Sequence, residues 1–320
     1  MAVETIIRLL SDGKFHSGES IAKQLEVSRT AIWKYIQQLK TLGVDVYSVS
    51  GKGYRLAQAL ELLDVERISD SMRSGTQQPF QLDVFQNIAS TNQILQSLES
   101  REKFHFCLSE YQSMGRGRQG KRWHSPFARN IYLSVKTQIQ RPPEQLSGLS
   151  IAIGLMLAQL FQRLGVQNMA VKWPNDLKIN DQKVGGILVE LTSAKRGEVI
   201  IGVGLNWQMD NQQQIDQAWT NLAPNLPHLG RNDVVIAMAL QLIEGLQQFE
   251  LDGLTHFLPQ WPLYDWLANQ TVELSLGPRK VYGIARGIDA TGALLVEDDT
   301  GIKPYVGGEV SARLRHDPTA

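Results

Sequence analysis

The chain has 320 residues, of which 42% are hydrophobic and 20% charged, with a mean hydropathy of −0.20. This length allows about two domains of roughly 150 residues, and the composition is that of a folded protein rather than a disordered one. The longest apolar stretch, 149–160, is interrupted by polar residues and is shorter than the roughly 20 residues that a membrane span needs. The single cysteine, Cys107, excludes an internal disulfide. With no signal-peptide pattern at the start, we expect a cytoplasmic protein without membrane contact.

The net charge of zero hides an uneven distribution. Residues 1–60 hold 8 basic and 5 acidic side chains, a balance of +3, so the remainder carries −3. A basic end on a neutral chain favours contact with nucleic acid. The six histidines have no cysteine at ligand spacing, so we expect no structural metal site.

Residues 1–62 predict a winged helix-turn-helix domain. A first helix ends near Leu10, a second covers 18–26, and a third covers 29–42 with Ser28 as its N-cap. A strand at 44–49, a tight turn at 51–53 and a strand at 54–56 follow as a basic-tipped hairpin. In this arrangement the later helix lies in the major groove and the hairpin contacts phosphates. We expect DNA contact from Ser28, Arg29, Thr30, Trp33, Lys34, Gln37, Lys52 and Arg55. The alternative is a small helical module that binds protein or packs on the rest of the chain.

A linker at 57–64 leads to a second domain, 63–270, in which strands and helices alternate. The pattern predicts helices at 65–72, 91–98 and 149–164, and strands at 82–85, 104–111, 131–135, 171–173, 177–179, 186–191 and 199–203. We therefore expect a mixed sheet with helices packed on it, an α+β fold.

A glycine-rich basic loop follows the strand that ends near Tyr111. Its glycines are Gly115, Gly117 and Gly120, and its cations are Arg116, Arg118, Lys121 and Arg122. Glycines let backbone N–H groups approach a ligand closely, and guanidinium groups neutralise phosphate or carboxylate oxygens. The loop is neither a Walker loop nor a dinucleotide fingerprint. The alternative is that these residues form an ordinary basic loop in solvent that binds no ligand.

Two further stretches carry polar groups at strand ends. Residues 172–176 read Lys-Trp-Pro-Asn-Asp and place a cation, an amide and a carboxylate at one rim. Lys183 then precedes Gly185 and Gly186, at the start of a strand whose apolar residues can line a pocket. A single lysine in such a place is otherwise a surface residue.

The 90–92 Ser-Thr-Asn stretch, the 115–118 loop, the 172–176 stretch and Lys183 before 185–190 occur in the order found in biotin-protein ligases. With the winged segment in front, the whole chain resembles the bacterial bifunctional biotin-protein ligases and biotin operon repressors. The resemblance implies a central domain of the class II aminoacyl-tRNA synthetase/biotin ligase type. It also implies that biotin and ATP give biotinyl-5′-AMP, from which biotin passes to a lysine of the biotin carboxyl carrier protein of acetyl-CoA carboxylase.

The resemblance also implies roles for individual residues. Lys183, Arg118 and Arg116 are the expected catalytic cations, because charge develops on the α-phosphate and the leaving pyrophosphate. The expected biotin-binding residues are Ser90, Thr91, Asn92, Gln112, Gly115, Arg116, Arg118, Trp123, Lys183, Gly186 and Leu188. The expected nucleotide-binding residues are Arg118, Arg122, Lys172, Asn175, Asp176, Asn206 and Trp219, with Mg²⁺ near Asp176. Lys121 is expected to help close the loop over the intermediate.

Residues 271–320 predict a third, small domain. Strands at 271–276, 280–289, 292–297 and 303–310 alternate with glycine turns, which resembles the SH3-like β barrel of the same family. The domain is compatible with a purely structural lid, and the alternative is that its arginines Arg313 and Arg315 contact the nucleotide.

Three alternatives remain open: a lipoate-type ligase, a ligand-sensing DNA-binding regulator without catalysis, and a ligase whose winged segment only stabilises the fold. The polar Ser90, Thr91 and Gln112 favour biotin over lipoate, and the combination of Lys183, Arg118 and Asp176 favours catalysis. We also expect a ligand-induced homodimer on operator DNA of biotin biosynthesis genes, because one module of charge +3 makes too few phosphate contacts for specific binding.

Overall fold

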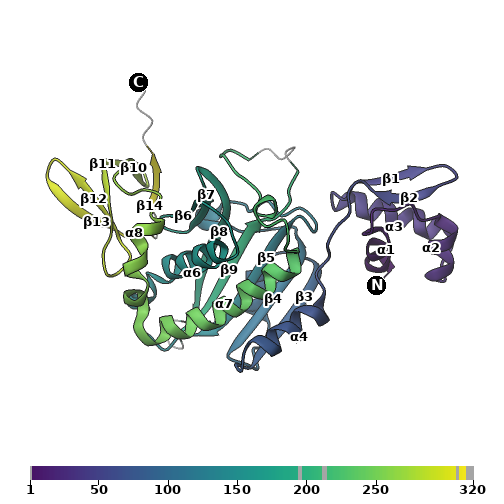
Figure 1. Ribbon diagram of the computed structural model, residues 1–320, viewed down its shortest axis with the longest axis horizontal. Coiled ribbons are helices and arrows are strands. Elements are labelled where there is room, and N and C mark those ends of the chain that lie inside the picture. Colours follow the sequence, from purple (N-terminus) through teal and green to yellow (C-terminus); the bar gives the residue numbers. More distant parts are fainter. Residues whose placement is uncertain (1, 194–196, 211–214, 308–309, 315–320) are drawn as a thin grey trace, which may run out of the picture.

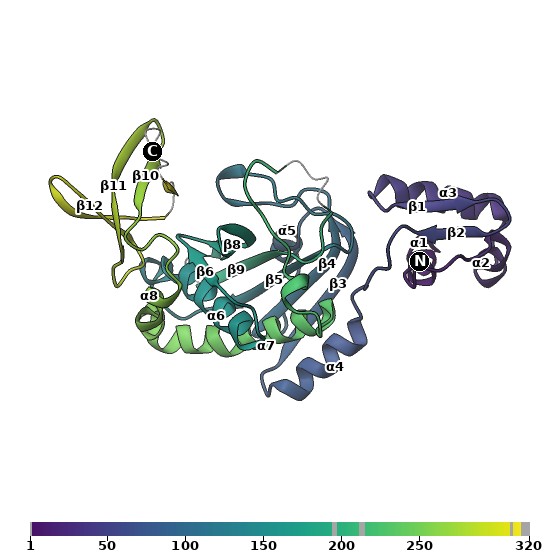
Figure 2. The same cartoon turned by 45° about the horizontal axis from the view of Figure 1, so that its top comes forward.

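The computed structural model describes residues 2–193, 197–210, 215–307 and 310–314. A winged helical module lies at one end of a central sheet-and-helix domain, and a small β-sheet lies at the opposite end (Figures 1 and 2). The α+β class and this order of modules are as predicted.

The amino-terminal module contains α1 (Ala2–Leu10), α2 (Gly18–Gln24), α3 (Arg29–Thr41), β1 (Val46–Val49) and β2 (Gly53–Leu56). Ser28 caps α3 by accepting a hydrogen bond from the Ala31 N–H at 3.2 Å, as predicted. The turn into β2 requires Gly53, which has φ +98° and packs so closely that a Cβ would lie 2.0 Å from the His16 carbonyl oxygen. The helix-turn-helix and the wing are therefore both present.

The central domain is a seven-stranded sheet. Its strands are β3 (Phe80–Ile88), β4 (Phe104–Gln112), β5 (Asn130–Gln138), β6 (Met169–Lys172), β7 (Asp176–Ile179), β8 (Gln182–Ser193) and β9 (Glu198–Asn206). Their order across the sheet is β3-β4-β5-β9-β8-β7-β6, and only the β3–β4 pair is parallel among the described residues. The edge strands are therefore β3 and β6.

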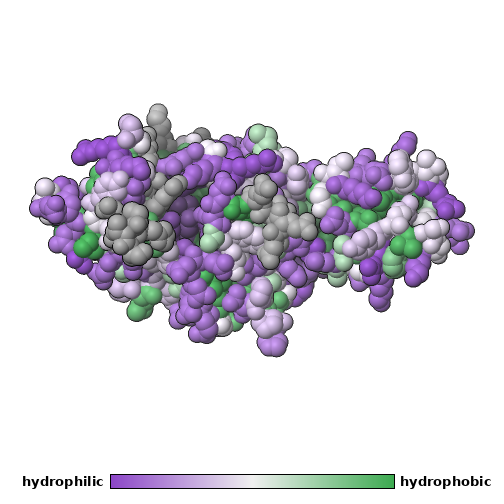
Figure 3. Space-filling model, turned by 90° about the horizontal axis from the view of Figure 1, so that it is seen from above, coloured by the Kyte–Doolittle hydropathy of each residue, from purple (hydrophilic) through white to green (hydrophobic). Residues whose placement is uncertain are grey.

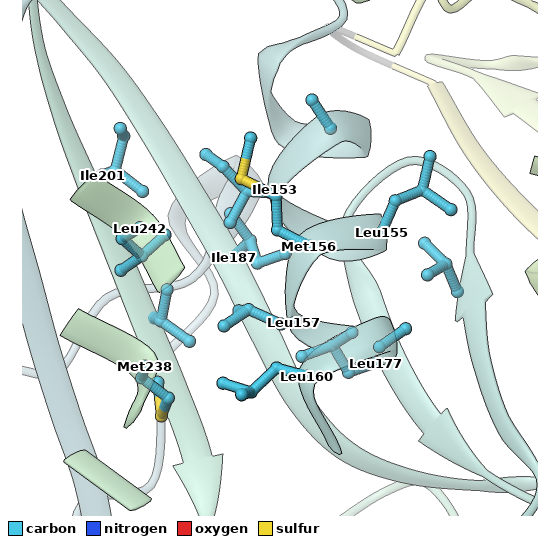
Figure 4. Packing of buried hydrophobic residues seen from close by; sticks show 14 of the residues in the cluster. Ile153, Leu155, Met156, Leu157, Leu160, Leu177, Ile187, Ile201, Met238 and Leu242 are labelled. Atoms are coloured by element: carbon cyan, nitrogen blue, oxygen red, sulfur yellow. The ribbon is translucent and has the colours of Figure 1, made fainter. Parts of the chain in front are cut away.

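Helices cover the two faces of this sheet unequally. α6 (Leu149–Arg163) and α7 (Arg231–Asp252) pack together on one face, and α4 (Val65–Gly75) packs against α7. Figure 4 shows side chains of α6 and α7 packed against Ile187 of β8 and Ile201 of β9. On the other face, short α5 (Thr91–Ser97) covers the region of Cys107, Ser134 and Ile200. The rest of that face is left for the loops that follow β4 and β9.

α7 and the short α8 (Trp261–Tyr264) were not predicted from the sequence. α7 has apolar residues on most of its circumference because it is buried against both α6 and α4. Two helical stretches, 143–163 and 231–256, are long and apolar enough to cross a membrane by length and composition alone. Their most apolar windows are 72% and 50% buried inside the protein, as in core helices. The face of the molecule seen in Figure 3 is mostly hydrophilic.

The carboxy-terminal module is a five-stranded antiparallel sheet. It contains β10 (Thr271–Leu276), β11 (Arg279–Ile288), β12 (Leu294–Asp298), β13 (Gly301–Tyr305) and β14 (Val310–Leu314), in the order β13-β12-β11-β10-β14. The predicted single strand at 303–310 is wrong: β13 ends at Tyr305 because it pairs with β12, whereas β14 begins at Val310 and pairs with β10. The residue pattern at 303–310 did not indicate that the chain leaves β12 and pairs with β10 instead.

Candidate active site

The ligand end of the site is built on the N-terminal turn of α5. Thr91 donates two hydrogen bonds to Gln112 Oε1, from its backbone N at 2.8 Å and from Oγ1 at 3.1 Å. Gln112 Nε2 in turn donates to Ser125 Oγ at 3.2 Å. Ser90 precedes this turn as the N-cap of α5 and is 2% exposed. The buried polar groups that were predicted from the 90–92 stretch and Gln112 therefore lie together.

Asn92 links this turn to the basic loop through Glu190. Asn92 Nδ2 donates to Glu190 Oε2 at 2.7 Å, and the Arg116 guanidinium lies 2.9 Å from Glu190 Oε1. Glu190 ends the motif that begins at Lys183, and the sequence predicted no role for it. Its position on β8, two residues beyond Leu188 on the same face of the strand, is the signal that was overlooked.

The floor of the site lacks side chains where β8 and β9 run side by side. A Cβ on Gly204 would lie 2.5 Å from the Trp123 ring, and one on Gly202 would lie 2.4 Å from Asn92 Oδ1. A Cβ on Gly186 would also touch Trp123, at 3.4 Å. Trp123 Nε1 is buried and has no hydrogen-bond partner among the residues that the structure describes. The site therefore presents a flat aromatic wall with one unused donor.

Lys183 and Asp176 form the charged centre of the site. Lys183 Nζ lies 2.7 Å from Asp176 Oδ1 and 5.5 Å from the centroid of the Trp123 ring. Arg118 Nη1 donates to Asn175 Oδ1 at 3.2 Å, next to this pair. Burial lowers the pKa of Arg118, and the charge of Asp176 opposes that change. The predicted amide and carboxylate, Asn175 and Asp176, thus meet two cations at the rim, but these cations are Arg118 and Lys183 rather than Lys172.

The segment after β9 closes one side of this centre. Asn206 Nδ2 donates to the Lys183 carbonyl oxygen at 3.3 Å and to the Thr220 carbonyl oxygen at 3.2 Å. Trp219 forms a parallel bridge with Lys183. These contacts hold the start of β8 and the Trp219 segment together, so both predicted nucleotide-binding residues adjoin Lys183.

Other predicted residues lie farther out. Arg122 is exposed and donates to the Ser113 carbonyl oxygen at 3.2 Å, and Lys121 is also exposed. Lys172 is paired in register with Asp176, and its Nζ lies 5.5 Å from the Trp266 ring. Arg315 and the side chain of Arg313 lie outside the described residues.

The burial of Lys178, which is 7% exposed, was not predicted from the sequence. Its Nζ lies 3.5 Å from the centroid of the Trp266 ring. Burial and the nearby charge of Lys172 lower its pKa to about 8. The signal was available, since a lysine between two core residues of a short strand is unusual.

The loop with the predicted cations has its own internal hydrogen bonds. Gly117 N donates to the Lys121 carbonyl oxygen at 2.7 Å, and Trp123 N donates to the Gly115 carbonyl oxygen at 2.9 Å. Gly115 allows this return because a Cβ there would lie 2.6 Å from the Trp123 carbonyl oxygen. The loop therefore folds back and brings Trp123 over Gly204.

The predicted DNA-contacting residues lie on α3, at its N-cap and on the wing. Ser28, Arg29, Thr30, Trp33 and Lys34 are exposed, with Trp33 54% exposed, and Gln37 is partly buried. Lys52 at the wing tip is exposed. Arg55 differs from the others because it is half-buried, with its guanidinium 4.9 Å from the Phe15 ring and 5.4 Å from the Tyr47 ring. Arg55 therefore packs against aromatic rings at the base of the wing and is only partly exposed to solvent.

Comparisons with known proteins agree with these features. Residues 84–206 match the Biotin/lipoate A/B protein ligase family, 3–55 match an HTH domain, and 268–313 match the Biotin protein ligase C terminal domain. The bifunctional ligase/repressor BirA of Salmonella typhimurium is 41% identical over 314 residues, which cover 97% of each chain. The Escherichia coli protein of the same name is 40% identical, over 96% of each chain.

The chain belongs to the bifunctional biotin ligase/repressor family. Members of this family join a ligase domain and a DNA-binding domain in one polypeptide, and this chain contains both. Its fold is similar to that of the biotin protein ligase from Aquifex aeolicus in complex with biotin and ATP. That match has a TM-score of 0.65 and 24% identity, and it covers 73% of this chain and 99% of that chain.

Proposed function

We propose that this chain activates biotin with ATP at the Lys183 centre and transfers it to a lysine of the biotin carboxyl carrier protein. In the first step a biotin carboxylate oxygen attacks the α-phosphorus, which forms biotinyl-5′-AMP and releases pyrophosphate. In the second step the carrier lysine amine attacks the biotin carbonyl carbon, which forms an amide, releases AMP and loses a proton. The observation that carries the proposal is the Lys183–Asp176 pair beside Trp123, with Arg118 at hydrogen-bond distance from Asn175.

The cations supply what the first step needs. Negative charge builds up on the α-phosphate and the leaving pyrophosphate, and fixed cations lower the energy of that transition state. Lys183 and Arg118 would meet the carboxylate and the α-phosphate, whereas Arg116 and Arg122 would hold the intermediate from the loop. Asp176 together with ATP phosphates suits Mg²⁺, which is usually bound by one or two carboxylates and substrate phosphates. The described residues contain no cluster of three His, Cys, Asp or Glu side chains for a metal cage.

The uncharged end of the site suits biotin. A mostly apolar molecule with one ureido group needs an apolar wall and a few hydrogen-bonding groups. Trp123 and Leu188 would supply the wall, and the Ser90–Thr91 turn and Gln112 the polar groups. The unpaired Trp123 Nε1 is a further donor.

The test of the ligase activity is incubation with ATP, biotin and a carrier domain, with acceptor mass as the readout. We expect a gain of one biotin per acceptor, and none when ATP is omitted. A parallel reaction with lipoate in place of biotin addresses the lipoate-type alternative, and equal transfer of lipoate would contradict the biotin assignment.

For the repressor function, the exposed face of α3 and the wing support binding to operator DNA of biotin biosynthesis genes. A gel shift with and without biotin plus ATP tests it. We expect retardation that depends on both small molecules, and retardation of equal strength without them would contradict ligand-dependent repression. A Lys34→Ala/Lys52→Ala variant should weaken the shift and leave biotin transfer unchanged.

We further propose that biotinyl-5′-AMP drives homodimerisation through an edge strand of the central sheet, where strand addition can join two protomers.

The unmodified carrier protein would then compete with the second protomer for the same surface. Repression would therefore occur only when the supply of biotin exceeds the demand for it. Sedimentation with and without the adenylate tests this. A protein that stays monomeric at micromolar concentration with adenylate bound, yet binds operator as before, would refute it. A cytoplasmic location suits these partners and the single cysteine.

A further inference from the structure

A buried polar cluster lies where the linker from the winged module enters the ligase domain. We call it the linker cluster; its members are Glu61 of the linker, Glu110 of β4, and Arg231 and Asn232 at the start of α7. Glu110 and Asn232 are each 2% exposed and Arg231 is 1% exposed. Charged groups this deeply buried are rare unless they are paired.

The linker side of the cluster is fixed to the first turn of α7. The Glu61 carboxylate accepts hydrogen bonds from the backbone N–H groups of Arg231 and Asn232, the second at 3.1 Å. It therefore caps a helix that begins 170 residues later in the chain, where a negative charge is also favoured by the helix dipole. Arg231 Nη1 donates back to the Glu61 carbonyl oxygen at 2.7 Å. Asn232 adds a bond from Nδ2 to the Leu62 carbonyl oxygen at 2.9 Å.

The other side of the cluster is fixed to β4. Arg231 Nη2 forms an ion pair with Glu110 Oε2, and the Leu63 backbone N donates to Glu110 Oε1. A single guanidinium thus bonds the linker backbone and the β4 carboxylate at once. Displacement of the linker would remove the bond from Arg231 to the Glu61 carbonyl oxygen and the bond from the Leu63 N–H to Glu110, and buried polar groups that lose their partners are costly.

From Glu110 the contacts continue to the biotin end of the site. Glu110 and Gln112 are two residues apart at the end of β4, where Glu110 contacts Arg231 at the start of α7 and Gln112 contacts Thr91 at the start of α5. The Ala128 N donates to the Glu110 carbonyl oxygen at 2.9 Å, and Arg231 Nη1 lies 3.5 Å from the Ala128 carbonyl oxygen. Gln112 holds the same returning segment through Ser125. The linker cluster and Gln112 therefore fix β4 and the 123–128 segment to each other at two neighbouring points.

We infer that the linker cluster is a positioning relay that sets Gln112 and Trp123 for biotin according to how the linker of the winged module is seated. Glu61, Glu110 and Arg231 are positioning residues and touch no substrate. This inference rests on the proposed biotin site. Coupling between two sites is reciprocal. If the position of the linker changes the affinity for biotin by some factor, biotin binding must change the equilibrium between linker positions by the same factor. Through this relay, biotin binding in one protomer changes the position of the linker that leads to the DNA-binding module of the same protomer.

The test compares Glu61→Gln with Glu66→Gln. The first change puts an amide NH₂ against backbone donors of α7 while it keeps the shape of the side chain. The second is the same change at an exposed carboxylate on α4. For Glu61→Gln we expect the KM for biotin to rise roughly 5- to 10-fold, at the lower end of allosteric couplings. The KM for ATP and kcat should stay within about twofold, and the enhancement of operator binding by biotin plus ATP should fall. Glu66→Gln should change none of these.

A second variant, Arg231→Lys, keeps the charge but removes the guanidinium that spans the linker and β4. We expect it to raise the KM for biotin at least as much as Glu61→Gln does, measured at a temperature where thermal unfolding shows a folded protein. An unchanged KM for biotin in folded Glu61→Gln would overturn the relay. Equal increases in the KM for biotin and for ATP together with a lowered Tm would overturn it too, because that pattern is general destabilisation. If the wild-type protein itself shows no biotin-dependent exchange of pyrophosphate into ATP, the proposed function fails instead.

Discussion

The two faces of the central sheet are built in opposite ways from the same strands. Along β9 the residues Val199, Ile201, Val203 and Leu205 are buried in the helix-covered core, whereas Gly202, Gly204 and Asn206 alternate with them on the other face. The first face is filled with branched side chains along the whole strand, whereas the second carries Ile200 under α5 and has no branched side chain from Gly202 to Asn206. The buried side chains on one side of β9 therefore stabilise the core, and the glycines on its other side leave room for a ligand.

The largest effect is expected at the charged centre of the open face. Lys183→Ala removes a cation aimed at developing negative charge, which should slow adenylate formation on the order of 10²- to 10³-fold. The Tm should change little, because Lys183 lies at the start of β8 outside the core clusters. Pyrophosphate release measures the rate, and Lys40→Ala, at an exposed lysine on α3, is the control. A Lys183→Ala enzyme that releases pyrophosphate at a near wild-type rate would refute the assignment.

On the packed face the expected effect is on stability. Ile201→Ala leaves a cavity between β9 and the helices (Figure 4) and should lower the free energy of unfolding by about 2–5 kcal/mol. The KM values of the remaining folded enzyme should be unchanged. Denaturant titration measures the loss, and Leu191→Ala, at a residue 45% exposed on β8, should cost no more than about 0.5 kcal/mol. Equal losses from both variants would contradict the contrast between the faces.

A smaller effect is expected from filling the floor of the site. Gly204→Ala places a Cβ 2.5 Å from the Trp123 ring, so the ring must move, and we expect the KM for biotin to rise about tenfold, equal to roughly 1.4 kcal/mol. Gly186→Ala meets the same ring at 3.4 Å and should have a weaker effect. Steady-state kinetics measure both. If Gly186→Ala proved the more harmful of the two, Trp123 would not be the wall that biotin contacts.

The smallest effect is expected under α5, where the open face is locally covered. Cys107 is fully buried there, and burial raises the pKa of its thiol far above the ordinary value. The thiolate is the reactive form, so the native protein should resist alkylation. Mass spectrometry after treatment with iodoacetamide should find Cys107 unlabelled in the native protein and labelled after unfolding. Rapid labelling of the native state would mean that α5 does not cover this part of the sheet.

Much of this protein is determined by local sequence. Helical spacing and the Ser28 cap predicted α3, and the glycines at 51–53 predicted the wing. The four motifs in order predicted, through the resemblance to biotin-protein ligases, which residues would gather at the site, and each motif lies at or next to the end of a strand. Charge and glycine are local signals, so the basic loop and Lys183 could be found without knowledge of the fold.

Only the tertiary structure decided the rest. α7 was missed because its residues are apolar nearly all round, which gives no period to detect, and its first turn is capped by Glu61, 170 residues earlier. Glu190 gains its role from Asn92 and Arg116, and Glu110 gains its role from Arg231, contacts that span about 70 to 121 residues. Such pairings depend on the order of strands in the sheet. The side chains involved are ordinary carboxylates until the fold buries them beside a particular cation.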